Sequence, residues 1–406
     1  MTTRPGSRAN PPLARIVVLQ YIAIETPEQG MAKRSVFEEV SQPGSAAEVT
    51  QAAKPVERAV SRGGIAVWLW LLAALVAVMV LVGGATRLTD SGLSITEWAP
   101  VMGSIPPLSQ ADWDAAFAAY KTTTEFQEQN HWMTLAEFKP IYWWEWGHRF
   151  LGRFIGLVWF AGFLWFLARG RIPNGWTGRL LLLGVLGGAQ GAVGWWMVAS
   201  GLSGRLDVAP YRLATHLGLA FAIFGLLVWY ALRVVKDEVE ILRARRQRLP
   251  GVMSWTGALI ALIFVQILSG ALVAGLDAGR GYVDWPLMEG SFLPPESFDL
   301  SPVWHNFFEN PALAQFDHRM IAYAIVLATI AFFISAGKVA HQRAKGWVRL
   351  TAFVVLAQVA VGIVTVMHAA PLGLALIHQA LALVLFGVLI RTRFEAAYPS
   401  DQSIRG

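Results

Sequence analysis

The chain has 406 residues, 55% of them hydrophobic and only 15% charged, and its mean hydropathy of +0.47 predicts an integral membrane protein that crosses the bilayer several times. The formal net charge of +6 does not indicate nucleic-acid binding, because the basic residues lie in short connections between apolar segments. The absence of cysteine excludes disulfides, iron–sulfur clusters, thiolate-ligated metals and covalently attached c-type heme.

The first 62 residues are polar and show no pattern of secondary structure. The apolar stretch from Leu13 to Ile24 is too short to cross a bilayer, and no signal-peptide cleavage site follows it. We expect residues 1–62 to form a disordered cytoplasmic tail, and one hypothesis is that translation starts at Met31.

Apolar runs of roughly 20 residues, the length at which a helix crosses a bilayer, then follow one another from Ile65 to Ile390. Continuous runs of this length predict helices, since the strands of a membrane barrel are shorter and alternate in polarity. The eight predicted spans are 65–86, 143–168, 179–200, 212–234, 253–275, 316–337, 348–369 and 373–391.

The connections between these spans alternate in charge. The loops after spans two, four and six are basic, as at Arg171, Arg245 and Lys345, and so is the segment after span eight. The other loops are neutral or acidic, as at Asp284 and Glu296. The positive-inside rule therefore predicts that both termini lie in the cytoplasm.

Three landmarks recur at nearly one offset, which indicates an internal duplication. The motif Ala-Gln-x-x-Val-Gly at residue 189 returns 168 residues later, His148 matches His318 at 170, and His216 matches His378 at 162. Four spans per copy give both copies the same orientation in the membrane. The expected architecture is all-α, with two pseudo-symmetric four-helix bundles at 63–234 and 253–393, a basic cytoplasmic linker at 235–252 and a cytoplasmic tail at 394–406.

A histidine lies near the predicted outer end of each even-numbered span: His148, His216, His318 and His378. Ionisable side chains inside a membrane are costly and mark functional sites. The second and fourth helices of each half can hold a heme iron between their two imidazoles. A hydrogen-bonded helix contact would explain a single membrane histidine, but not four at equivalent positions of a repeat. We interpret the remaining histidines as surface or interfacial residues: His131, His305, His341 and His368.

The two halves differ three residues before the first histidine of each. Glu145 shares a helical face with His148, whereas Gln315 holds that position before His318. A carboxylate can transfer protons and an amide cannot, so we expect chemistry in the first half and an electron-transfer cofactor in the second. The alternative is that Glu145 pairs with a nearby arginine or faces the outer water.

Three arginines lie close in sequence to the histidines: Arg149, Arg153 and Arg319. Their guanidinium groups can hold heme propionates by paired hydrogen bonds. An equally good alternative is that these long side chains simply reach the membrane interface. Arg149 and Arg153 are also the candidate partners of Glu145.

Longer motifs point to one family. They are GGATRLTDSGLS at 83–94, EFKPI at 137–141, EWGHRFLGR at 145–153, GALVAGLDAG at 270–279, WPLM at 285–288 and NFFEN at 306–310. Over roughly residues 64–393 the chain closely resembles the heme A synthase family, in the cysteine-free form of alphaproteobacteria and mitochondria.

The resemblance implies two four-helix bundles and an oxidoreductase. This enzyme converts the C8 methyl group of heme O, by successive hydroxylations, into the formyl group of heme A for cytochrome c oxidase. The resemblance also implies that His318 and His378 ligate a heme b cofactor. His148 and His216 would hold heme O, with Glu145 as the catalytic carboxylate.

The location implied is a bacterial inner membrane, with the mitochondrial inner membrane less favoured. Candidate partners are the heme O synthase (a protoheme farnesyltransferase), oxidase assembly factors, membrane lipid and a second copy of the chain, with no nucleic acid. We expect the outer loops at 87–142 and 276–315 to cover the heme edges.

Three other functions fit parts of the pattern. A di-heme b-type electron-transfer protein would use the same four histidines without needing Glu145. A transporter built from repeats would show broken helices or charges at mid-membrane, whereas the charges here lie near the span ends. A single metal site of four histidines would need all four side chains to converge.

Overall fold

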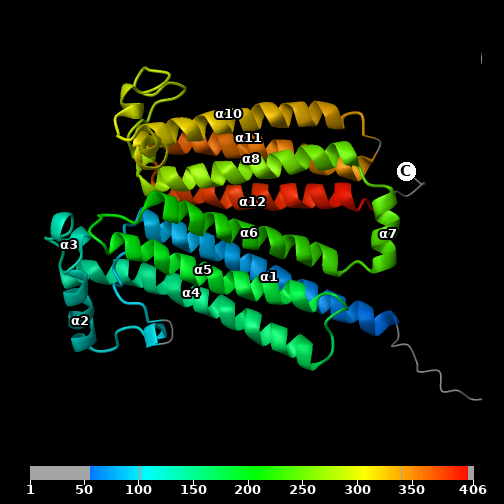
Figure 1. Cartoon of the computed structure of the whole chain (residues 1–406), viewed down its shortest axis with the longest axis horizontal. Helices are drawn as coiled ribbons and strands as arrows, with labels where there is room; N and C mark the ends of the chain where they lie inside the picture. The colour runs from blue at the N-terminus through cyan, green and yellow to red at the C-terminus, as the bar shows by residue number, and fades with distance from the viewer. Residues whose placement is uncertain (1–54, 100–101, 340, 401–406) are drawn as a thin grey trace, which may run out of the picture. The chain divides into compact units, whose positions relative to one another are not determined.

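Eight long apolar helices make up most of the described chain (Figure 1). The computed structural model describes residues 55–99, 102–339 and 341–400, with side chains from residue 62 onward, so most of the predicted tail and Met31 lie outside it. No β-strand occurs in these ranges, and the predicted all-α membrane protein with eight spans is confirmed. The long helices are α1 (Pro55–Leu88), α4 (Leu135–Ala168), α5 (Thr177–Gly201), α6 (Pro210–Val234), α8 (Pro250–Gly275), α10 (Pro311–Ala336), α11 (Gln342–Met367) and α12 (Leu372–Ala397).

Several helices extend beyond the apolar runs that predicted them. Helix α4 begins at Leu135 rather than residue 143, because Thr134 and Glu137 form a capping box that satisfies the first backbone N–H groups. Helix α10 begins at Pro311, where the Asn310 side chain accepts a hydrogen bond from the Leu313 N–H. Hydropathy locates the part of a helix that lies in lipid and misses polar turns beyond it.

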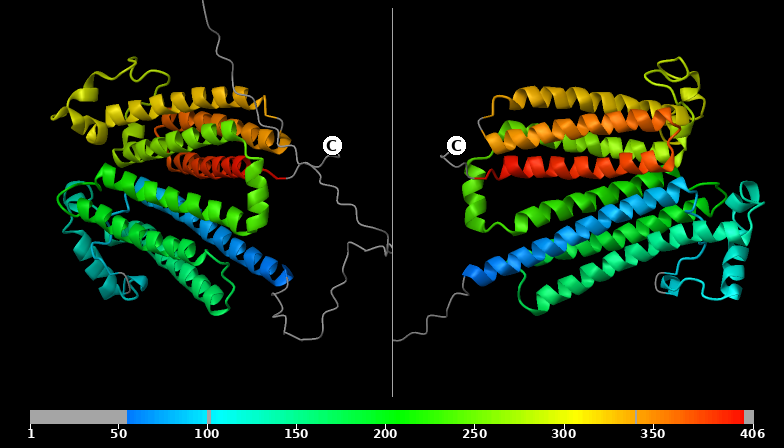
Figure 2. Two further views of the ribbon diagram at one scale, coloured as in Figure 1. Left: turned by 45° about the vertical axis from the view of Figure 1, so that its right-hand side comes forward. Right: turned by 180° about the vertical axis from the view of Figure 1, so that it is seen from behind.

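The long helices form two groups, each a closed ring of contacts (Figures 1 and 2). Helices α1, α4, α5 and α6 form the first group, and α8, α10, α11 and α12 form the second. Helix α7 (Glu238–Arg246) connects them in sequence at one end, called here the linker end. There Arg62 of α1 donates to the Lys236 carbonyl (2.7 Å), and the Leu249 N–H donates to the Ala396 carbonyl (2.9 Å).

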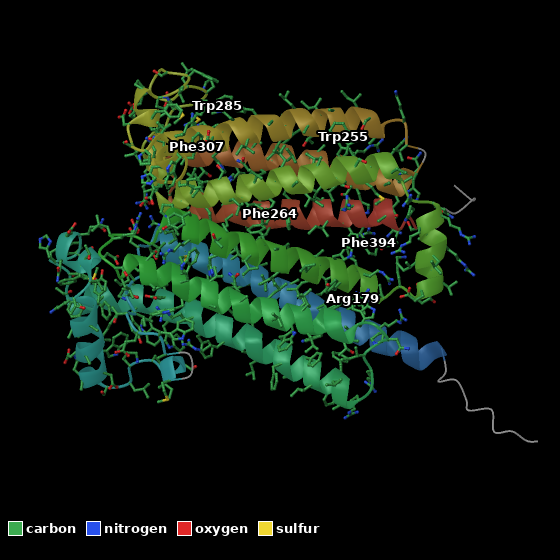
Figure 3. All side chains as sticks on the ribbon, viewed as in Figure 1. Arg179, Trp255, Phe264, Trp285, Phe307 and Phe394 are labelled. Carbon is green, nitrogen blue, oxygen red and sulfur yellow. The ribbon has the colours of Figure 1, made fainter. Side chains whose placement is uncertain are left out.

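The two groups pack together through α1 and α6 on one side and α8 and α12 on the other. Most of this interface is apolar: Phe221 lies edge-on to Phe386, and Phe264 of α8 lies beside Gly218 of α6 (Figure 3). Between the helices themselves, Gln379 of α12 adds a polar contact by donating to the Val80 carbonyl of α1 (3.1 Å). Its amide lies directly on Gly84, where any side chain would overlap it.

The opposite end of the groups, called here the loop end, carries the two long connections. The first contains η1 (Met102–Ser104), α2 (Gln110–Tyr120) and α3 (Thr124–Glu128). It packs on the start of α4 through a cluster of aromatic residues: Trp113, Phe117, Tyr120, Phe138 and Tyr142. The second contains η2 (Ala278–Arg280), η3 (Pro295–Phe298), η4 (Val303–His305) and α9 (Asn306–Glu309), with Trp285 and Phe307 exposed on it (Figure 3).

Candidate functional site

The four predicted histidines lie in the loop-end part of α4, α6, α10 and α12, and each ring packs against a glycine of the long helix that precedes it in the chain. A Cβ atom on any of these glycines would lie only 2.8–3.0 Å from the ring, so a larger residue would displace the imidazole. The four pairs are Gly83–His148, Gly194–His216, Gly270–His318 and Gly362–His378.

His148 and His216 face each other inside the first group, with ring centres 6.5 Å apart and ring planes inclined by 64°. Two imidazoles on opposite faces of one metal, each with a metal–nitrogen bond of about 2 Å, have ring centres roughly 6 Å apart. Both side chains remain partly exposed, so space is left beside each ring. The spacing therefore fits a heme iron held between them.

His318 and His378 have the matching glycine contacts in the second group, and both are partly exposed. Across the described ranges, no three residues among His, Asp and Glu come together as a metal-binding cluster. This finding contradicts the four-histidine metal site and leaves one histidine pair in each half.

Glu145 is buried one turn from His148, and three donors hold its carboxylate. Arg149 donates to Oε1 (2.5 Å), while the Ser94 hydroxyl and the Ile95 N–H donate to Oε2 (2.7 Å each). The side chain is only 3% exposed, which excludes the alternative that it faces outer water. The alternative pairing with Arg149 is present, so Glu145 also anchors the loop after α1.

Gln315 is the counterpart of Glu145 in the second half. It is buried, and its amide nitrogen donates to the Tyr282 carbonyl (2.9 Å). Both residues thus hold the loop that follows the first helix of their half. Only the first half places a carboxylate there.

The three candidate arginines donate to carbonyl groups of the loop-end connections. Arg149 contacts the Glu97 and Ile95 oxygens (2.9 and 2.7 Å), and Arg153 contacts the Ala99 oxygen (2.9 Å). Arg319 contacts the Leu287 and Tyr282 oxygens (2.9 and 3.1 Å). These bonds fasten the loops beside the histidines, and propionate binding by the same arginines stays a prediction.

Comparison with known proteins decides the family. The family described as cytochrome oxidase assembly protein matches residues 66–390, which is most of the chain. The chain belongs to this family.

Its relatives extend over nearly the whole sequence. A heme A synthase of Dinoroseobacter shibae is 54% identical over 381 residues, covering 92% of this chain and 98% of the relative. Those of Ruegeria pomeroyi and Paracoccus denitrificans are each 53% identical, covering 92% and 93% of this chain and 100% and 99% of the relatives.

One prediction about the remaining histidines is wrong. His341 is buried. Its Nδ1 accepts a hydrogen bond from the Ala344 N–H at the start of α11 (3.1 Å), and its Nε2 lies 3.0 Å from the Ser400 carbonyl. His131 and His368 are exposed, and His305 is partly exposed, as predicted.

Sequence reasoning also missed the three glutamines beside the histidines, Gln190, Gln266 and Gln358. Each donates from Nε2 to the backbone carbonyl of a histidine, at 3.0, 3.0 and 3.1 Å. The signal was present, since Gln190 and Gln358 belong to the repeated Ala-Gln-x-x-Val-Gly motif. In the sequence this motif indicates duplication, and only the structure shows that its glutamine contacts a histidine.

Glu125 of α3 is a second buried carboxyl group at the loop end, and its Oε2 has no hydrogen-bond partner within the described part of the chain. Burial, reinforced by the charges of Asp207, Asp90 and Glu145 and opposed by Arg87, raises the pKa of Glu125 to about 8. The folded loop thus favours the protonated carboxyl group at neutral pH.

We expect Glu125 to destabilise the protein progressively as the pH rises. Below the ordinary pKa of 4.5 the carboxyl is protonated in both folded and unfolded chains, whereas between 4.5 and about 8 only the unfolded chain ionises freely, so stability falls across this window. In thermal unfolding of detergent-solubilised protein across this pH range, the unfolding midpoint should fall more steeply with pH for the native chain than for Glu125→Gln. Equal pH dependence in the two proteins would contradict the expectation.

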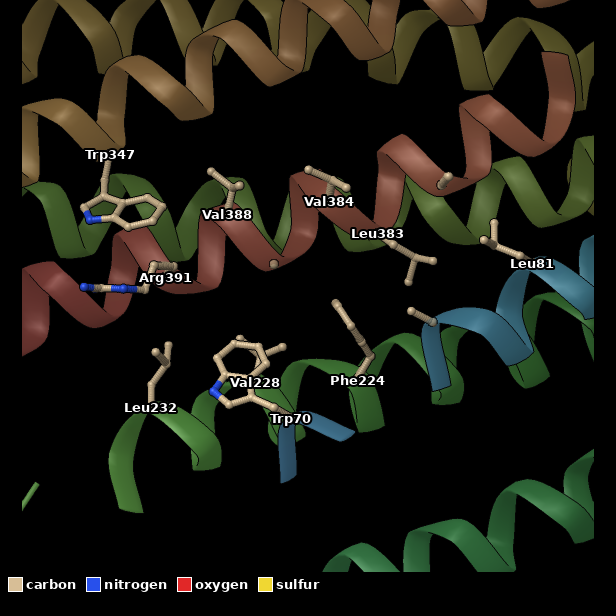
Figure 4. Close-up of a pocket in the computed structure, with 13 residues that line it drawn as sticks. Trp70, Leu81, Phe224, Val228, Leu232, Trp347, Leu383, Val384, Val388 and Arg391 are labelled. Carbon is tan, nitrogen blue, oxygen red and sulfur yellow. The ribbon is translucent and has the colours of Figure 1, made fainter. Parts of the chain in front are cut away.

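A separate apolar pocket of about 600 Å³ lies between α1, α6 and α12 (Figure 4). Leu81, Phe224 and Val384 contribute to its walls, and Trp347 and Arg391 line it toward the linker end. None of the four histidines lines it. It is therefore distinct from the two histidine pairs.

Proposed function

We propose that this chain is a heme A synthase, an oxidoreductase that converts the C8 methyl group of heme O to a formyl group by successive hydroxylations. The facing pair His148–His216, with ring centres 6.5 Å apart and buried Glu145 one turn away, carries the proposal. Identities of 53–54% to heme A synthases over more than nine-tenths of the chain support it.

In this proposal the halves 63–234 and 253–393 divide the work. His148 and His216 hold the substrate heme O, and His318 and His378 hold a resident heme b. When bound, the iron porphyrins supply the oxidising and electron-transfer chemistry, and the protein supplies binding and orientation. The difference between Glu145 and Gln315 at matched positions supports placing the reaction in the first half.

Glu145 is the proposed proton acceptor. Each hydroxylation replaces a C–H bond of the methyl group with a C–O bond, an oxidation whose electrons the bound iron porphyrins would take up, and a positioned carboxylate can accept a proton that this oxidation releases. Arg149, Ser94 and Ile95 fix the orientation of this carboxylate. Arg149 also holds residues 95–97 of the loop after α1 through the Ile95 and Glu97 carbonyl groups.

The cellular setting is likewise proposed. The basic loops favour both termini in the cytoplasm, and the bacterial relatives favour the inner membrane of a bacterium. A heme O-making farnesyltransferase is the proposed donor of substrate, since so hydrophobic a heme requires direct transfer.

Arg149, Arg153 and Arg319 are the proposed propionate ligands.

The test of this function is mass spectrometry of hemes extracted from membranes that make heme O, with and without the chain. Heme A, or its hydroxylated precursor, is expected only when the chain is present. Unchanged heme O beside a chain that still binds heme would overturn the proposal in favour of a di-heme electron carrier.

A further inference from the structure

The four histidine–glycine contacts share a further position, four residues before each glycine. Glutamine occupies it in three cases, at Gln190, Gln266 and Gln358. In the fourth case, before Gly83 and beside His148, the residue is Met79. The pattern that repeats around the other three histidines is therefore broken at His148.

The three glutamines make nearly identical contacts. Besides donating to the backbone carbonyl of its histidine, each Nε2 lies 3.1–3.4 Å from both ring nitrogens. Each Oε1 is buried and has no hydrogen-bond partner among the described residues, so the amide contacts its histidine through the nitrogen alone. Hydrogen-bonded neighbours of this kind fix the orientation of a histidine that ligates a metal, and losing one weakens metal binding.

Met79 cannot serve in this way. Its thioether has no N–H to donate, and its methyl group lies against Gly152, one turn along α4 from His148. A second difference between the halves, Glu145 in place of Gln315, also lies beside His148. Both of these differences between the halves therefore lie next to the same histidine, His148.

We propose that Met79 makes His148 the releasable histidine of the four, while glutamines restrain the other three. This inference rests on the proposed function, in which a substrate heme must enter and a product heme must leave the first half. A histidine that no neighbouring side chain holds in place is less well oriented and binds iron more weakly. Weak attachment at His148 and firm attachment at His216 let the heme exchange without losing its orientation. The resident heme of the second half is held firmly on both faces, by Gln266 and Gln358.

Heme-transfer kinetics of the full-length protein test the proposal. Detergent-solubilised chain is loaded with hemin and mixed with excess apomyoglobin, and the transfer of heme is followed by absorbance. The native chain should release heme in a fast and a slow phase, with the fast phase lost in His216→Ala, which removes the firm ligand of the first half. Met79→Gln should slow the fast phase roughly 10–100-fold, and Gln266→Met should accelerate the slow phase by a similar factor.

Met79→Leu is the matched control, because it keeps an apolar side chain of similar size and adds no amide. It should release heme at the native rate. If Met79→Gln behaves like Met79→Leu while His216→Ala still removes the fast phase, the role of Met79 is refuted and the proposed function survives. If no phase depends on His216, the heme assignment of the first half fails, and this inference fails with it.

Discussion

Replacing Glu145 with glutamine should slow heme A formation by about 10²–10⁴-fold, the usual contribution of a positioned acid–base group. The amide keeps the volume of the side chain and can still accept from Ser94 or Ile95, but it cannot take up a proton. The heme of the second half should keep its absorption spectrum, because Glu145 contacts only first-half residues and the loop after α1. Initial rates of heme O conversion in membranes with matched protein levels measure the effect.

Gln315→Ala is the control for this substitution. It removes the side chain at the matched position of the second half, and with it the hydrogen bond to the Tyr282 carbonyl. We expect it to affect stability more than turnover. Equal rates for Glu145→Gln and the native chain, or a larger loss of rate in Gln315→Ala, would refute the assignment of chemistry to the first half.

Replacing Arg87 with alanine should destabilise the whole loop end. This mostly buried guanidinium group contacts Asp90 (2.8 Å), Asp277 (2.7 Å) and Asp207 (3.4 Å), and so ties the end of α1 to the α5–α6 loop and to the segment after α8. Its loss leaves three carboxylates without their shared cation. Removing one partner of a buried ion pair lowers the free energy of unfolding by about 3–5 kcal/mol. Because these aspartates are partly exposed, we expect Arg87→Ala to lower it by about 2–3 kcal/mol.

Arg280→Ala is the matched control, because Arg280 also pairs with Asp277 (3.5 Å) but is itself 45% exposed. Exposed pairs contribute at most about 1 kcal/mol. The thermal unfolding midpoint of Arg87→Ala should therefore fall well below that of Arg280→Ala. Similar midpoints would show that the cluster does not hold the two groups together.

The spans and the matching positions of the four histidines could be predicted, because hydropathy and repeated motifs can be read directly from the sequence. Hydropathy measures whether a helix can lie in lipid, and duplication places matching histidines at matching depths. The start of α4 escaped prediction because its first turns are polar and held by a cap.

The contacts around the histidines could not be predicted, because they join distant parts of the chain. Arg149 binds loop carbonyls more than 50 positions earlier in the sequence, and Gln266 contacts a histidine 52 residues away. The sequence places His341 in a loop, and the structure shows that this residue directly precedes α11, where its ring accepts a hydrogen bond from the Ala344 N–H. The importance of Met79 emerges only when three glutamines are seen at the equivalent contacts.

The central claim is the division of labour between the halves, and the most direct test is the heme content of chains purified from cells that make heme O. We predict that replacing both His148 and His216 with alanine removes bound heme O and heme A and leaves heme B. Replacing both His318 and His378 should instead remove heme B. Loss of heme B from the first variant, or heme O retained without His148 and His216, would contradict the account.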